Sequence, residues 1–222
     1  MESAYRVGHK EARNYAESHH YRLWGRLFKA AGLPLYLPVA GVSEVGTSKI
    51  VRESSFHPYT RSCIRGKWPN ACENCWKCFR KNMIEEKFNT GFVTEQYLAR
   101  SLGIKEVKLK LQQWPVSHEN VLAWALQGSL GHHNRLLSQR FEGTNRDLSY
   151  LECFYPPSID LIPNNYQEHT ISKLRKFLPP MKESFFKIVT EHHMGPWLET
   201  DSATTAKKEF DDFMLSEFPT TS

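Results

Sequence analysis

The sequence contains no apolar run that approaches about 18 residues, which argues against a membrane-spanning helix. Residues Met1 to Arg6 lack the apolar core of a secretory signal peptide, so we expect a cytoplasmic, reducing location. A Walker-type phosphate loop is missing as well. Gly41 and Gly46 have the spacing that opens such a loop, but Thr47-Ser48-Lys49 follow, in which the lysine comes too late.

The charge of the chain is unevenly placed along its 222 residues. Residues 1–90 contain 15 lysines and arginines against 8 acidic residues, a balance of +7; the remaining residues contain 14 against 16, a balance of −2. A basic half favours an anionic partner such as a nucleotide or a nucleic acid. An ordinary solvated basic surface would give the same counts, so the charge alone does not decide.

Cysteine is scarce, yet four of the five cysteines fall in one short stretch with the spacing C-x8-C-x2-C-x2-C. Zn²⁺ binds four thiolates at the corners of a tetrahedron, and each C-x2-C pair supplies neighbouring thiolates from one tight turn. Gly66, Pro69 and Asn70 allow the longer loop to bend, so that the first cysteine returns to the others. We therefore predict a structural zinc site with the ligands Cys63, Cys72, Cys75 and Cys78.

Other interpretations of these cysteines remain open. A disulfide cluster requires an oxidising compartment, whereas an iron–sulfur cluster uses the same thiolates and is not excluded by spacing. A closed four-cysteine site leaves no position for water, so we expect the metal to stabilise the fold rather than to catalyse. His57 is the histidine nearest the cluster and the one candidate for a substitute ligand, and Cys153 is expected to be a small buried apolar residue.

Hydrophobic periodicity predicts a mainly helical chain with one short β element. An amphipathic helix is expected over about Lys10–Ala31, and the apolar run Leu35–Ala40 is expected to form a buried strand. Thr94 and Ser117 are expected to cap helices. We place a domain boundary after residue 90, with a helical extension over 91–222. Further helices are expected over residues 48–55, 78–88, 94–102, 118–127, 132–141, 167–177, 181–193 and 204–218.

Several short motifs follow one another between Ser18 and Asn82. They are a helix ending in Ala31-Gly32, a strand, the helix start Ser48-Lys49-Ile50-Val51, Pro58-Tyr59, Ser62-Cys63, and then Cys72, Cys75, Cys78 and Arg80. This series resembles the C-terminal part of the 7-cyano-7-deazaguanine synthase (QueC-like) family, which belongs to the PP-loop ATP-pyrophosphatase superfamily. The resemblance implies that residues 1–90 are the C-terminal portion of a PP-loop α/β domain, with a structural zinc site near the active cleft.

Members of that family use ATP to adenylate a carboxylate of a deazaguanine, then add ammonia and dehydrate the product to a nitrile. This chemistry requires a Ser-Gly-Gly-x-Asp-Ser turn, whose backbone N–H groups hold pyrophosphate. The chain contains no Gly-Gly pair. We therefore expect it to be inactive alone and to use ATP only together with a PP-loop-bearing partner or a missing N-terminal half.

Four residues are candidates for substrate binding. Lys49 and Arg80 match basic residues of the family and would meet an anionic ligand; the alternatives are a surface lysine and an arginine that supports the cysteine loop. Ser43 and Glu44 follow the expected strand, where open α/β sheets place their ligands. Ser43 is equally suited to begin the next helix as its cap.

The leading hypothesis is a zinc-bearing portion of an ATP-dependent synthase-like enzyme acting on a deazapurine or nucleotide. The alternative is a non-catalytic zinc-knuckle module that binds nucleic acid or a protein partner. Trp68 and Trp76 flank the metal loop beside Lys67 and Lys77, and such aromatic and basic side chains can stack on bases. The same tryptophans can instead shield the thiolates from water. The acidic half also allows a purely helical partner protein.

Overall fold

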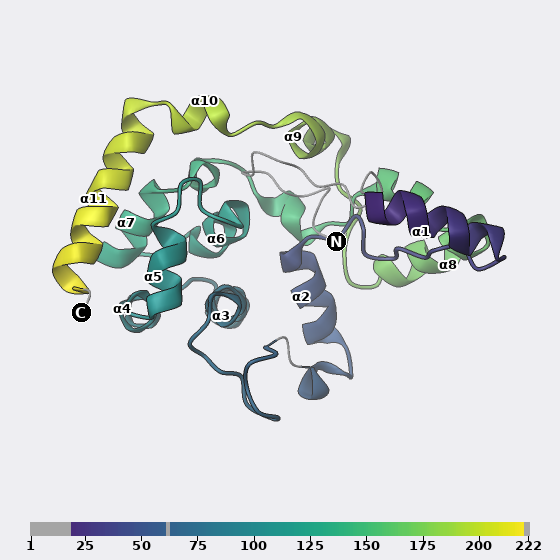
Figure 1. The fold of residues 1–222 in the computed structure, drawn as a ribbon, viewed down its shortest axis with the longest axis horizontal. Coiled ribbons are helices and arrows are strands. Elements are labelled where there is room, and N and C mark those ends of the chain that lie inside the picture. Colours follow the sequence, from purple (N-terminus) through teal and green to yellow (C-terminus); the bar gives the residue numbers. More distant parts are fainter. Residues whose placement is uncertain (1–18, 61–62, 220–222) are drawn as a thin grey trace. The chain divides into compact units, whose positions relative to one another are not determined.

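The computed structural model describes residues 19–60 and 63–219, which form short helices joined by loops (Figure 1). The chain divides into two compact units, each made from two separate stretches. The first unit comprises Met1–His57 and Ser149–His192, and the second comprises Pro58–Leu148 and His193–Ser222. The mainly helical prediction is confirmed. The domain boundary expected after residue 90 falls inside the second unit, where one of its helices ends.

The first unit has a small core of Val42, Phe154, Leu174 and Leu178, packed beneath short helices. Its two stretches of chain are joined by an antiparallel bridge between Val42 and Phe154, and Phe154 also bridges to Pro180. Its elements are α1 (His19–Ala30), α2 (Glu44–Glu53), η5 (Ser149–Glu152), η6 (Pro156–Leu161), α8 (Asn164–Leu174), η7 (Glu183–Phe185) and α9 (Phe186–Glu191).

The prediction of a strand over Leu35–Ala40 is wrong. The chain has no regular structure up to Leu37 and then turns over residues 38–41. Pro34 and Pro38 lack the N–H group that a strand donates to its neighbour, and this favours a turn over a ladder. Within residues 19–60 and 63–219, β structure is limited to the isolated bridges at Phe154.

The second unit is organised around α6 (Glu119–Leu126), in which every residue is buried. A helix that is buried on all sides is typical of a central position in a bundle. Helix α6 contacts α3 and η4, and α7 contacts α4 and α11. The other elements of this unit are α3 (Trp76–Thr90), α4 (Glu95–Leu102), α5 (Lys105–Leu111), α7 (His132–Gln139), η4 (Glu142–Asn145), α10 (Gly195–Leu198) and α11 (Asp201–Glu217). None of the helices described is long and apolar enough to cross a membrane.

Helix ends follow the predicted signals in some places and not in others. Thr94 is the N-cap of α4 and accepts the N–H of Tyr97 at 3.2 Å, as predicted. Ser117 is not a cap, because α6 begins after His118, whose φ is 62°. The expected helix 181–193 is broken into η7 and α9, and α5 and α10 were not predicted. The first part of the helix expected over 10–31 lies outside the described residues.

Candidate metal centre

The four clustered cysteines meet at one point of the second unit. The sulfur atoms of Cys63, Cys72, Cys75 and Cys78 all lie within 4.8 Å of one another. The Sγ atoms of Cys72 and Cys78 are 3.7 Å apart. Four sulfurs bound at about 2.3 Å to one zinc ion lie about 3.8 Å apart at the corners of a tetrahedron. The donor set and its spacing therefore fit one tetrahedral metal ion.

The start of α3 presents two of the thiols. Cys75 is the N-cap of α3, and its sulfur accepts the N–H of Cys78, which lies in the first turn, at 3.5 Å. On the loop that precedes α3, the N–H of Cys72 is donated to the sulfur of Cys63 at 3.4 Å. Such N–H···S contacts favour the charged thiolate, which is the form that binds metal.

Gly66 allows the loop to close. A Cβ atom at this position would lie 2.2 Å from the carbonyl oxygen of Asn70 and 2.8 Å from the nitrogen of Cys72. No real side chain tolerates such contacts, so only glycine lets the two arms of the loop approach this closely. The glycine was singled out in the sequence for its flexibility, and the structure gives it this more specific steric role.

The electrostatic environment differs among the thiols. The N–H group of Cys72 lowers the pKa of Cys63 to about 6. Burial raises the pKa of Cys78 far above the usual range for a thiol, and the neighbouring Cys75 adds to this. A bound Zn²⁺ removes the protons of the thiols that coordinate it, which offsets the effect of burial. A metal ion would thus bind Cys63 of the loop and the buried Cys78 of α3 together.

Glu106 of α5 supports the cysteine loop, a role that no sequence motif indicated. Its carboxylate forms an ion pair with Arg65 of the loop and accepts the N–H of Trp76, the first residue of α3, at 3.2 Å. These two bonds lower the pKa of Glu106, with the Arg65 contact contributing most. The Glu106 carboxylate therefore joins the cysteine loop to the start of α3. Its partners lie 41 and 30 residues away, so no local pattern could reveal them.

The two tryptophans beside the cysteines have different environments. Trp76 is buried and stacks on Phe79 with 5.5 Å between ring centroids, whereas Trp68 is 65% exposed. Arg80 is also buried, and its guanidinium lies 5.8 Å from the Trp76 ring centroid. The burial of Trp76 leaves no room for a base to stack on its ring, and shielding of the cysteines by this ring stays a prediction. The Trp68 ring is exposed to solvent, and a binding role for Arg80 stays a prediction.

The other candidate binding residues lie on α2 of the first unit. Ser43 is the N-cap of α2, accepts the N–H of Gly46 at 2.9 Å and donates its hydroxyl to the carbonyl of Leu151. This capping role is the alternative that the sequence offered. Glu44 is buried in the first turn of α2, and Lys49 pairs with Glu152 at 3.6 Å. Substrate binding by these residues stays a prediction.

None of the described histidines joins the metal centre. Among the described residues, the four cysteines alone form a group of histidine, cysteine or acidic side chains that could hold a metal ion, so His57 is not a ligand there. Cys153 is half-buried rather than buried, and its thiol points to the carbonyl of Ser149 at 3.7 Å.

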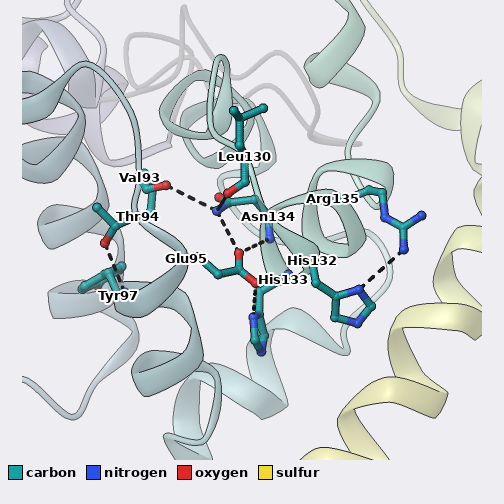
Figure 2. A network of polar contacts seen from close by, with 9 residues as sticks. All are labelled: Val93, Thr94, Glu95, Tyr97, Leu130, His132, His133, Asn134 and Arg135. Carbon is teal, nitrogen blue, oxygen red and sulfur yellow. Dashed lines mark hydrogen bonds and ion pairs between the residues drawn. The ribbon is translucent and has the colours of Figure 1, made fainter.

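Figure 2 shows a second polar network, at the start of α7. The Glu95 carboxylate accepts the backbone N–H of His133 at 2.7 Å, the side chain of the same histidine, and the Asn134 side chain at 3.1 Å. Glu95 thus caps α7 from another helix, because the local N-cap, Gly131, has no side chain to do so. His133 belongs to this structural network, whereas the neighbouring His132 contacts Arg135.

These features define a mainly helical protein with a four-cysteine site suited to a metal ion. The chain belongs to the DUF6395 family, described as a family of unknown function, whose model matches residues 23–192. The match includes the cysteine loop and most of both units. Searches of curated proteins and of solved structures found no match to the chain.

Proposed function

We propose that the cysteine cluster is a structural zinc site that fastens the loop 63–72 to the start of α3. The observation that supports this most directly is the 3.7 Å separation of the Cys72 and Cys78 sulfurs, close to the edge of a zinc–thiolate tetrahedron. A multi-iron cluster would spread its thiolates over several metal atoms and hold them farther apart. Four protein thiolates complete the coordination, so the ion stabilises the fold and has no position for substrate.

We further propose that the chain serves as the zinc-bearing C-terminal portion of an ATP-dependent, QueC-like enzyme that forms an amide or nitrile. The order of Pro58-Tyr59, the cysteines and Arg80 supports this assignment. A PP-loop supplied by a partner or by another segment would bind ATP and activate a carboxylate on a deazapurine or nucleotide. Under this assignment Ser43, Glu44, Lys49 and Arg80 keep their predicted roles in substrate binding.

The zinc assignment is tested by measuring metal content and thermal unfolding of the full chain and two variants. Cys72→Ser removes one proposed ligand, and Cys153→Ser removes the one cysteine outside the cluster. We expect about one zinc ion per chain in the wild type and in Cys153→Ser, and both loss of zinc and unfolding of residues 60–85 in Cys72→Ser, because metal binding and folding are coupled in such sites. Zinc retained by Cys72→Ser with an unchanged melting temperature would refute the assignment.

The enzymatic assignment is tested separately by pyrophosphate release from ATP. The chain is assayed alone and mixed with a protein that carries the Ser-Gly-Gly-x-Asp-Ser turn and is encoded beside it. Release that requires both components, and that falls when Lys49 is changed to alanine, supports the assignment. The absence of release from the mixture, with zinc content normal, contradicts the enzymatic part and leaves the metal site intact.

Exposed Trp68 favours a second candidate, a zinc knuckle that stacks on single-stranded nucleic acid. Lys67 beside it is exposed as well. Base stacking on an aromatic side chain contributes about 1–3 kcal/mol, and phosphate contacts weaken steeply with salt. Binding of random oligonucleotides that falls as salt rises and is reduced by Trp68→Ala would support this candidate; binding that is insensitive to both would contradict it.

A further inference from the structure

A basic hollow of about 760 Å³ lies in the first unit, between α1 and the segment that leads into α8. Residues of α1 and of the start of α8 line this same hollow, and both helices belong to the first unit (Figure 1). On the α1 side the lining contains Arg22, Arg26 and Lys29, and on the other side Asp160 and Asn164. Three cations against one carboxylate leave a charge of +2 in the lining. The hollow therefore favours an anionic ligand.

The three cations are brought together by helical spacing. Arg22, Arg26 and Lys29 follow one another four and three residues apart, which places them on one face of α1. Helix α1 contains no acidic residue. Within the described parts of the chain, none of the three cations has an acidic side chain within ion-pair distance. Like charges at this spacing repel one another, and a bound anion would relieve that repulsion.

The opposite wall adds a second favourable feature. Helix α8 begins at Asn164, and its N-cap, Pro163, provides no side-chain hydrogen bond. The first N–H groups of a helix carry partial positive charge and are well suited to bind phosphate. Asn164 and Asn165 line the hollow at this end. Cationic side chains and a helix N-terminus thus line the same space.

We propose that this hollow binds a phosphate-bearing small molecule. Arginine forms paired hydrogen bonds with phosphate oxygens, and Arg22 and Arg26 offer two such groups beside Lys29. Ligand sites for small molecules enclose about 300–1,000 Å³, so the hollow is large enough for a nucleotide as well as for a free polyphosphate. The proposal does not rest on the zinc site or on the enzymatic assignment, because the lining of the hollow contains neither the clustered cysteines nor any of the residues proposed to bind the substrate.

Calorimetric titration of the full chain with ADP, and separately with inorganic pyrophosphate, at low salt tests the proposal. Arg26→Gln removes one central cation, and Lys208→Gln removes an exposed lysine on α11 as a matched control. We expect wild type and Lys208→Gln to bind at least one of the two probes equally well. Arg26→Gln should bind about ten-fold or more weakly, the effect of losing one charge-assisted hydrogen bond.

The two probes distinguish the source of the phosphate. Tighter binding of ADP identifies a nucleotide, and equal or tighter binding of pyrophosphate identifies a free phosphate chain; both support the site if Arg26→Gln weakens them. Lys29→Gln provides a second variant should Arg26→Gln fail to fold. The proposal is overturned if neither probe binds at millimolar concentration, or if Lys208→Gln weakens binding as much as the α1 variants.

Discussion

Glu119 offers a sharp test of how burial controls stability in the second unit. It begins α6, is 1% exposed and accepts the N–H of Gly143 at 2.8 Å. Burial raises the pKa of Glu119 to about 8, and the charge of Glu142 adds to this; the Gly143 N–H and Arg146 act in the opposite direction. Since an unfolded glutamate has a pKa near 4.5, the folded chain keeps this proton over a much wider pH range than the unfolded chain.

The sign and size of the effect follow from this difference. At Glu119 the folded state binds more protons than the unfolded state between pH 4.5 and 8. The contribution of Glu119 to the free energy of unfolding is therefore greatest at low pH and falls as pH rises through this window. With about 1.36 kcal/mol for each unit of pKa, raising the pH from 5 to 9 should lower the free energy of unfolding by roughly 4 kcal/mol through Glu119 alone. Above pH 9 the loss should be complete.

Urea denaturation at pH 5 and pH 9 measures this contribution when Glu119→Gln is compared with wild type. Glutamine keeps an oxygen for the Gly143 N–H but cannot ionise. We expect the stability advantage of Glu119→Gln over wild type to be roughly 4 kcal/mol larger at pH 9 than at pH 5. The exposed Glu209→Gln should show no such change. An identical pH dependence in wild type and Glu119→Gln would refute the reasoning.

Three further substitutions test packing contacts. Gly66→Ala should weaken zinc binding in a chelator competition, because its Cβ would lie 2.2 Å from the Asn70 carbonyl; an unchanged affinity would show that the loop adapts. Gly131 has a φ of 118°, and a Cβ added there would lie 2.3 Å from the Glu95 carboxylate. Gly131→Ala should therefore lower the free energy of unfolding in urea by about 2 kcal/mol or more, and a smaller loss would contradict this. Arg140→Ala removes the hydrogen bonds to the carbonyls of Leu111 and Gln113 and should lower the free energy of unfolding by about 3 kcal/mol in the same assay. Arg100→Ala, at an exposed position, should lower it little.

The part of the site that sequence could predict is the part that is local. The cysteine spacing predicted the cluster because C-x2-C pairs and a helix start fix their own geometry within a few residues. Thr94 predicted the start of a helix for the same reason, since capping depends on neighbouring residues. These signals needed no knowledge of the rest of the chain.

The parts that were missed depend on contacts between distant residues. Glu106 and Glu95 each satisfy N–H groups about 30 to 40 residues away, and nothing near either glutamate marks its partner. The strand at Leu35–Ala40 was predicted from apolar character, but a strand needs a neighbour, and the prolines there prevent pairing. The division into units could not be predicted either, because the first unit combines two distant stretches of chain that are joined by the bridge between Val42 and Phe154.

The proposed metal ion would explain how the cysteine loop holds its shape with so little core. Between Cys63 and Cys75, only Cys75 is buried, so the loop contributes almost no apolar surface to the second unit. The Glu106 ion pair with Arg65 also holds the loop, but its partners are partly exposed, so the pair contributes little on its own. Structural zinc, in contrast, contributes on the order of 10–16 kcal/mol in small peptide sites. The proposed zinc ion would therefore supply the strongest interaction at a segment that hydrophobic burial stabilises little.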